Sequence, residues 1–332
     1  MKYFYFFTGF IIIGYLLGPR VTFDTPKLLD TEIETPILKL DDFIHNSESL
    51  ISDLKPGNEA KIIWANDSLK NKTEYALVYL HGFSASHEEG APIHTDFAKR
   101  YGMNLYLTRL EDHGRADPNS LKNLTPENFT QSAEDALDIA KKLGEKVIVM
   151  SCSTGGTLSL ILAAAGEKID ALILYSPNID IADPKSDLLM LPWGKQMAKI
   201  VLGGENYKIQ YDEMGQKYWN PSYHYNSLFA LKSLINTYMN EETFKKVTTP
   251  VFVGYYYLDE DHQDDVVSVE RMKEMFDQLG TPPEAKHIQA FPESGHHVIS
   301  SYIMSKDVTG LEDATFQWAE SILGLMPIQD NR

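Results

Sequence analysis

The stretch of sequence that decides the fold of this chain is VIVMSCSTGGTL, residues 147–158. Its first four residues are apolar and predict a short buried strand, and residues 158–165 predict a helix. A strand that turns into a helix this abruptly passes through a strained backbone conformation, which requires small residues two positions before and two after the apex. Ser153 meets this condition, with Ser151 before it and Gly155 after it. The sequence therefore predicts Ser153 as a nucleophile at the N-terminus of a helix, where the helix dipole is positive.

The same stretch also fits a turn of small residues that binds nothing. Ser151 stands where the usual pattern of such a turn, G-x-S-x-G, has its first glycine, and S-x-S-x-G is the less specific of the two patterns. The rest of the chain has to decide between these interpretations.

Apolar runs and helical spacings alternate on both sides of this stretch. Strands are predicted at residues 76–80, 103–108, 171–175, 250–254 and 287–291, and helices at 93–101 and 129–143. Alternation of this kind indicates an α/β fold, in which helices cover both faces of a mostly parallel sheet. Functional sites in such sheets lie at the carboxyl ends of the strands, where Ser153 is expected.

The composition restricts the class of function. The 332 residues carry a formal charge of -17, which argues against nucleic acid as a partner because phosphate binding needs clustered Lys and Arg. The single cysteine excludes an internal disulfide and a cysteine-rich zinc site. An apolar content of 43% is ordinary for a globular protein.

The N-terminal segment, residues 1–20, is unusually hydrophobic. One Lys precedes a continuous apolar run from Tyr3 to Leu17, which is a little short of a bilayer core but has flanking Tyr, Lys and Arg that can anchor it. We interpret it as an uncleaved membrane anchor, with the catalytic domain extracytoplasmic. The alternatives are a signal peptide whose cleavage leaves a secreted or periplasmic protein, although it has no A-x-A-like site, and a helix packed on the protein itself.

The remaining chain divides by composition. Residues 21–60 contain Pro and Gly among polar residues and indicate a linker and edge structure. Residues 61–183 and 246–332 form the expected core, and residues 184–245 interrupt the alternation with aromatic residues, helical patches and no convincing strand. This insertion is expected to form a cap or lid over a pocket.

Five motifs in order resemble serine hydrolases of the α/β-hydrolase fold, in particular the carboxylesterase and monoacylglycerol-lipase-like members of the serine aminopeptidase (S33-type) family. The resemblance covers residues 75–325 and depends on residues 81–83 (HGF), 112–114 (DHG), 151–156 (SCSTGG), 264–268 (DDVVS) and 294–296 (SGH). It implies an order of nucleophile, acid and histidine along the chain.

Acyl transfer needs a nucleophile, a base and a group that orients the base. The resemblance places the base in the loop after the last strand, where the Ser-Gly-His pattern matches His296, with His297 as its competitor. It places the acid before two apolar residues, which matches Asp264. Other acids crowd the same loop and stay open as alternatives: Asp259, Asp261 and Asp265.

The resemblance also implies an oxyanion hole made by the backbone N–H groups of Phe83 and Thr154. His81 and His113 are expected to be structural. The acidic loop lacks the glycine and the terminal glutamate of an EF-hand, so we predict neither a metal nor a cofactor.

These features favour a serine hydrolase that cleaves carboxylic esters through Ser153, His296 and Asp264. The aromatic insertion and the apolar N-terminus suggest small-molecule or lipid-like ester substrates, such as monoacylglycerols. A peptidase, amidase or acyltransferase is the first alternative, with a cap carboxylate binding a substrate amine: Glu205, Asp212 or Glu213. A membrane-tethered binding protein without catalysis is the second.

Overall fold

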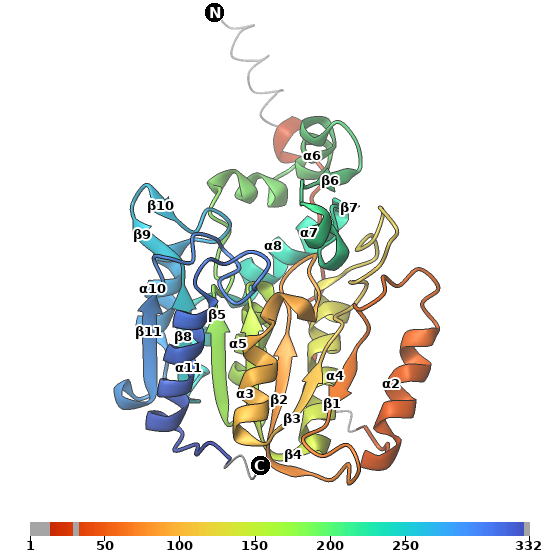
Figure 1. The fold of residues 1–332 in the computed structure, drawn as a ribbon. Helices are drawn as coiled ribbons and strands as arrows, with labels where there is room; N and C mark the ends of the chain where they lie inside the picture. The colour runs from red at the N-terminus through yellow and green to blue at the C-terminus, as the bar shows by residue number, and fades with distance from the viewer. Residues whose placement is uncertain (1–13, 29–32, 329–332) are drawn as a thin grey trace, which may run out of the picture.

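A computed structural model describes residues 14–28 and 33–328 of the chain, and its centre is one seven-stranded sheet (Figure 1). The strands lie in the order β1-β3-β2-β4-β5-β8-β11. Their bounds are Lys61–Ile63 (β1), Thr73–Leu80 (β2), Asn104–Leu107 (β3), Gly144–Cys152 (β4), Ala171–Tyr175 (β5), Val251–Tyr255 (β8) and Lys286–Ala290 (β11).

The sheet is parallel except at one edge, where β1 pairs antiparallel with β3. Strand β4 lies in the middle, with Val149 beside Val78 of β2 on one side and Leu172 of β5 on the other. The inner strands are buried on both faces and are rich in apolar residues, whereas the edge strands β1 and β11 are partly exposed. The predicted α/β class with a mostly parallel sheet is confirmed.

Helices cover both faces of the sheet. Side chains alternate along β2, so that Val78 belongs to one hydrophobic core and Tyr79 to the other. The first core includes buried residues of α4 (Pro126–Leu143), α5 (Thr154–Ala164), α9 (Glu241–Lys246) and α10 (Val269–Gln278). The second includes residues of α3 (Ile93–Tyr101) and α11 (Val308–Ile322).

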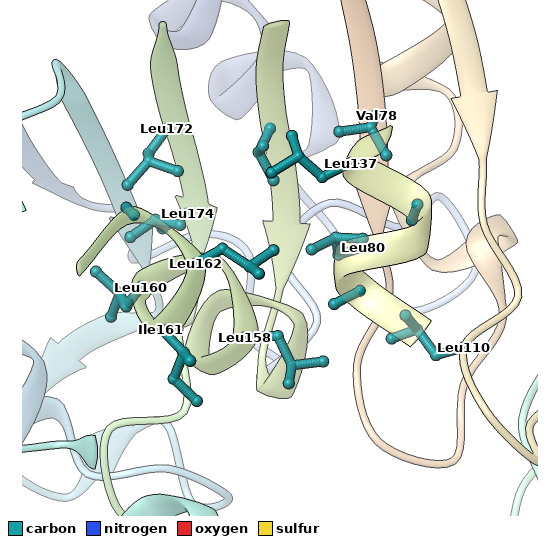
Figure 2. Close-up of a cluster of buried hydrophobic side chains, with 14 of the residues drawn as sticks. Val78, Leu80, Leu110, Leu137, Leu158, Leu160, Ile161, Leu162, Leu172 and Leu174 are labelled. Carbon is teal, nitrogen blue, oxygen red and sulfur yellow. The ribbon is translucent and has the colours of Figure 1, made fainter. Parts of the chain in front are cut away.

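Helix α5 is buried along nearly its whole length. Every residue from Thr154 to Ala163 is buried, which explains why the sequence of this helix shows no polar face. Figure 2 shows Leu158, Leu160, Ile161 and Leu162 of this helix among apolar side chains of the neighbouring strands. The element behind Ser153 is therefore held firmly by the core.

The segment between β5 and β8 has two parts. η3 (Pro184–Met190), α6 (Gly194–Leu202), α7 (Glu213–Tyr218) and the antiparallel strands β6 (Asn206–Lys208) and β7 (Ser222–His224) lie beyond the ends of the sheet strands in Figure 1. Helix α8 (Asn226–Tyr238) and α9 pack against α5 of the core instead. The two short strands were not predicted, because each has three residues and no alternating pattern.

The N-terminal region differs from the predicted linker. A short 3-10 turn, η1 (Ile37–Lys39), leads into a helix, α2 (Leu40–Ser49), which buries Leu40 and Ile44 in the first core. Most of the apolar run predicted as an anchor, residues 3–17, lies outside the described residues. Within residues 14–28 and 33–328, no helix has both the length and the apolar character to cross a membrane.

The other short elements are η2 (His87–Gly90), β9 (Tyr257–Asp259), β10 (His262–Gln263) and η4 (Pro283–Ala285). Strands β9 and β10 form a hairpin in the acidic loop after β8. Element η2 follows the loop after β2, and its residue Glu89 contacts Gly82 of that loop.

Candidate active site

Ser153 occupies a sharp bend between β4 and α5. Its backbone has φ 53° and ψ -120°, a strained combination for a residue with a side chain. Two hydrogen bonds to the end of β5 hold this conformation: the N–H of Ser153 donates to the carbonyl of Tyr175 at 3.0 Å, and its carbonyl accepts from the N–H of Asn178 at 2.9 Å. The strain is therefore fixed by the sheet.

The small residues around Ser153 have a steric reason. A Cβ at Gly155 would lie 2.0 Å from the carbonyl oxygen of Leu80, so a larger residue would push α5 away from β2. Ser151 lies at the end of β4, and its hydroxyl is buried without a hydrogen-bond partner among the described residues. The serine that replaces the usual glycine is thus accommodated, but its hydroxyl is not paired.

His297 and Asp264 form a close buried pair. Nδ1 of His297 lies 2.6 Å from Oδ2 of Asp264, and the two residues are 6% and 4% exposed. Oδ1 of Asp264 accepts from the N–H groups of Val266 at 2.9 Å and Val267 at 3.0 Å. The carboxylate thus fixes the orientation of the imidazole and leaves Nε2 as the ring nitrogen available for chemistry.

The structure brings Asp264 together with His297 and not with His296. His296 is half-buried, and its Nδ1 accepts a hydrogen bond from the N–H of Val298 at 2.9 Å. The predicted pairing of His296 with Asp264 is not found, because the ring of His296 turns back to the backbone N–H of Val298, whereas the buried ring of His297 lies against the carboxylate.

The alternative acids lie in different surroundings. Asp259, Asp261 and Asp265 are exposed, and Asp259 pairs with the exposed ring of His262 at 2.8 Å. Of the four acids that the sequence offered in this loop, Asp264 is the buried one with a histidine partner.

The surroundings of His297 favour its protonated form. Burial disfavours the imidazolium, but the carboxylate of Asp264 outweighs burial, with a smaller contribution from Glu89, and the pKa of His297 is raised above 6.5. Burial lowers the pKa of His296, with the neighbouring His297 adding to the effect. The two adjacent rings are therefore shifted in opposite directions.

These shifts predict the pH dependence of a reaction that uses neutral His297 as a base. We expect kcat/KM for p-nitrophenyl butyrate to decline on acidification with a midpoint above the ordinary histidine pKa of about 6.5, since His297 gains its proton there. A pH-rate profile measures the midpoint. A midpoint below that value would fit a base whose pKa is lowered, as for His296, and would contradict the assignment.

The loop after β2 presents the first predicted oxyanion donor. Nδ1 of His81 lies 2.9 Å from the carbonyl oxygen of Gly82, and Nε2 accepts from the N–H of Leu110 at 3.0 Å. Burial lowers the pKa of His81 to about 4, so the ring is neutral with its proton on Nδ1. His81 thereby orients the peptide whose N–H belongs to Phe83, which matches its expected structural role.

The two predicted oxyanion donors are available. Among the described residues, the N–H groups of Phe83 and Thr154 donate to no partner. The loop lies directly against the nucleophile, because a Cβ at Gly82 would be 3.0 Å from Cβ of Ser153. Unpaired backbone N–H groups close to a nucleophile are the kind of donor that can stabilise a developing oxyanion.

One residue of this site was not singled out from the sequence. Glu89 of η2 is 2% exposed, and its Oε2 accepts the N–H of Gly82 at 2.6 Å. The sequence HEEG places two acids side by side, and no pattern in it shows that the second one turns inward.

Residues of the segment between β5 and β8 contact the oxyanion loop, residues 81–84 after β2, which carries the first predicted oxyanion donor. The rings of Phe83 and Tyr223 meet edge to face with centroids 5.3 Å apart, and the N–H of Asn220 donates to the carbonyl of Ser84 at 2.8 Å. The ring of Tyr211 packs near Trp219. Tyr223 therefore lies against Phe83, and Tyr211 lies within hydrogen-bonding reach of the Ser84 side chain.

The three carboxylates that the sequence offered for amine binding lie in different surroundings. Glu205 pairs with Lys199 at 2.8 Å, and Asp212 accepts the N–H of Gly215 as the N-cap of α7. Glu213 is exposed in the first turn of the same helix. Within the described part of the chain, no group of three or more His, Cys, Asp or Glu side chains is placed to hold a metal ion.

Comparison with known protein families identifies the family of this chain. Residues 77–305 match the model of the alpha/beta hydrolase family, and the chain belongs to that family. The predicted family is thus confirmed, and the seven-stranded sheet flanked by helices is its fold. No curated protein matches the chain in sequence.

Solved structures similar to this chain include lipases and esterases. One was described with LipS and LipT, two metagenome-derived lipolytic enzymes, at 17% identity and a TM-score of 0.63, covering 80% of this chain and 98% of that one. A second is a soluble variant of monoglyceride lipase from Saccharomyces cerevisiae in complex with a substrate analog. It is 13% identical with a TM-score of 0.58, and the match covers 90% of this chain and 96% of that one. A third is the monoacylglycerol lipase of Paleococcus ferrophilus. It is 14% identical with a TM-score of 0.54, and the match covers 78% of this chain and 96% of that one. At these identities the similarity shows the shared fold.

Proposed function

We propose that this protein is a serine hydrolase that cleaves carboxylic esters through Ser153, His297 and Asp264. The observation that carries the proposal is the buried hydrogen bond between Asp264 and His297 in a fold that also holds Ser153 at a strained strand-to-helix bend. A nucleophile at such a bend and a histidine oriented by a carboxylate are the parts that acyl transfer requires.

The reaction follows from the roles of these groups. Nε2 of His297 takes the proton of the Ser153 hydroxyl as Oγ attacks the ester carbonyl, and the N–H groups of Phe83 and Thr154 stabilise the oxyanion. The imidazolium returns its proton to the alkoxide, which leaves as the alcohol. Water then attacks the acyl-enzyme with His297 again as base, and the carboxylic acid is released as Ser153 regains its proton.

The proposed substrates have an apolar acyl group. The aromatic side chains of Phe83, Tyr211 and Tyr223 beside the oxyanion loop favour apolar groups. Among the solved structures, the yeast monoglyceride lipase is bound to a substrate analog, and Est1E from Butyrivibrio proteoclasticus is bound to ferulic acid at 16% identity and a TM-score of 0.54. We therefore place monoacylglycerols and short to medium acyl esters first.

A substrate panel tests the reaction class. We expect turnover of p-nitrophenyl butyrate and octanoate, and of a monoacylglycerol, by the full chain, with little turnover of aminoacyl-p-nitroanilides. The three cap carboxylates offered for amine binding are paired, used in a helix cap or exposed, which supports esters over peptides. Activity on the anilides alone would replace the ester hydrolase by a peptidase or amidase on the same triad.

We further propose that the N-terminal segment attaches the enzyme to a membrane, with the catalytic domain outside the cytoplasm. The apolar run of residues 3–17 supports this. The chain next to that run contacts the cap, since the N–H of Trp193 donates to the carbonyl of Pro19 at 2.8 Å. Apolar side chains are exposed on the same part of the cap, with Ile200 79% and Val201 82% exposed.

Vesicle flotation tests this attachment. We expect the full chain to float with phosphatidylcholine vesicles, and a variant with Ile11, Ile12 and Ile13 changed to Ser to remain largely in the soluble fraction, because less apolar surface enters the bilayer. Both proteins should hydrolyse p-nitrophenyl butyrate equally. Equal flotation of the two proteins with the vesicles, or flotation of neither, would contradict attachment through this segment.

A further inference from the structure

Glu89 is held in a defined position beside the oxyanion loop. Its Oε2 accepts from the N–H of Gly82 at 2.6 Å and from the hydroxyl of Tyr79 at 3.3 Å. Its own backbone is fixed as well, because the hydroxyl of Ser300 donates to the carbonyl of Glu89 at 3.0 Å. A carboxyl group buried this completely needs such partners.

The carboxyl group and the nucleophile flank the same residue. A Cβ built on Gly82 would lie 2.8 Å from Oε1 of Glu89 and 3.0 Å from Cβ of Ser153. Gly82 therefore has no room for a side chain. Its peptide groups are held from two directions, by Glu89 at the N–H and by His81 at the carbonyl oxygen.

The charge of Glu89 is coupled to the proposed base. Burial raises the pKa of Glu89 to about 7, and the Gly82 N–H, His297 and Tyr79 act against burial. Glu89 also helps to raise the pKa of His297, although Asp264 makes the larger contribution. The titratable groups that face Glu89 and His297 come from β2, β4, the cap and the loops after β8 and β11: Tyr79, Cys152, Tyr211, Asp264, Asp265 and His296.

We propose that Glu89 is a positioning residue for the reaction, whose carboxyl group fixes the amide of Gly82 so that the N–H of Phe83 points at the developing oxyanion. The role rests on the proposed esterase function. Glu89 acts through the loop and does not touch the substrate. Without it, the Gly82 amide loses its buried acceptor, the loop samples other orientations, and the Phe83 N–H is lost from the oxyanion for part of the time.

The role predicts a particular kinetic pattern. Glu89→Ala should lower kcat for p-nitrophenyl butyrate by about 100-fold, the effect of losing one oxyanion donor, with KM changed less than about threefold. Glu89→Gln keeps an acceptor for the Gly82 amide and should recover kcat to within about fivefold of wild type. It removes the negative charge near His297, so the acidic midpoint of kcat/KM should move to lower pH.

Glu88→Gln is the matched control. Glu88 lies in the same 3-10 turn, but its carboxylate accepts from the exposed hydroxyl of Tyr302 at 3.0 Å and faces away from the site. We expect this variant to keep the wild-type kcat, KM and pH profile. Thermal unfolding of all variants reports on folding, and the pH profile of Glu89→Gln decides the question if Glu89→Ala does not fold.

The outcomes separate the two proposals. A wild-type kcat in Glu89→Ala, or an unchanged acidic midpoint in Glu89→Gln, overturns the role of Glu89 and leaves the esterase intact. A wild-type chain that hydrolyses no ester and whose Ser153 reacts with no fluorophosphonate overturns the esterase, and the role of Glu89 with it.

Discussion

Ser153→Ala is expected to lower kcat/KM for p-nitrophenyl butyrate by about 10⁴-fold or more, because alanine cannot form the acyl-enzyme. The small remaining rate would come from substrate binding and the oxyanion donors. The fold should be retained, since alanine removes one hydroxyl from a bend that backbone hydrogen bonds to Tyr175 and Asn178 hold. Steady-state kinetics and thermal unfolding of the purified full-length proteins measure both effects.

Ser151→Ala is the matched control for this variant. The Ser151 hydroxyl is buried near the end of β4, two residues before Ser153, and has no partner among the described residues. We expect its kcat/KM to stay within about threefold of wild type and its unfolding midpoint to rise slightly, because an unpaired buried hydroxyl is removed. Equal activity of Ser153→Ala and Ser151→Ala would exclude Ser153 as the nucleophile.

The second large effect distinguishes two adjacent histidines. His297→Gln should lower kcat/KM by about 10⁴-fold, because the base that exchanges the proton with Ser153 is lost and Asp264 loses its partner. The kcat/KM of His296→Gln should stay within about tenfold of wild type, because the His296 ring accepts a hydrogen bond from the N–H of Val298 and stabilises the turn. The kinetics of both variants with one p-nitrophenyl ester give the comparison.

The reverse result would be informative. Loss of activity in His296→Gln with activity retained in His297→Gln would contradict the pairing of His297 with Asp264 and restore the assignment made from the Ser-Gly-His pattern. Asp264→Asn should behave like a weaker form of His297→Gln, because the amide no longer stabilises the imidazolium.

Most of the sheet could be predicted from the sequence because its inner strands are buried on both faces. Runs such as residues 76–80 and 171–175 are continuously apolar, and the helix at 93–101 was predicted with its observed bounds. Position 153 followed from sterics alone, and Gly155 shows the reason in its contact with the carbonyl of Leu80. These strands, this helix and this bend could be predicted because each depends mainly on residues close together in the sequence.

The Ser-Gly-His pattern favoured His296 over His297, whereas the structure pairs His297 with Asp264. Both follow Gly295, and a single residue of difference in a turn decides which ring reaches Asp264. A motif counts positions from the glycine, whereas the direction of a side chain depends on the path of the backbone and on the side-chain rotamer. Glu89 was missed for a similar reason, because only the return of η2 to the loop after β2 brings it to Gly82.

The α2 helix and the strands β6 and β7 were missed for a different reason. Helix α2 has ten residues and buries few of them, so its apolar spacing is too sparse to stand out among polar residues. The two strands are stabilised by pairing with each other across the cap, which short segments of sequence do not reveal.

The most direct test of the central claim is the reaction of the full-length protein with a fluorophosphonate, followed by mass spectrometry of the intact chain and of its peptides. The account predicts one adduct per chain, on Ser153, that is absent from Ser153→Ala and strongly slowed in His297→Gln. An unmodified wild-type chain, or an adduct on another residue, would contradict it.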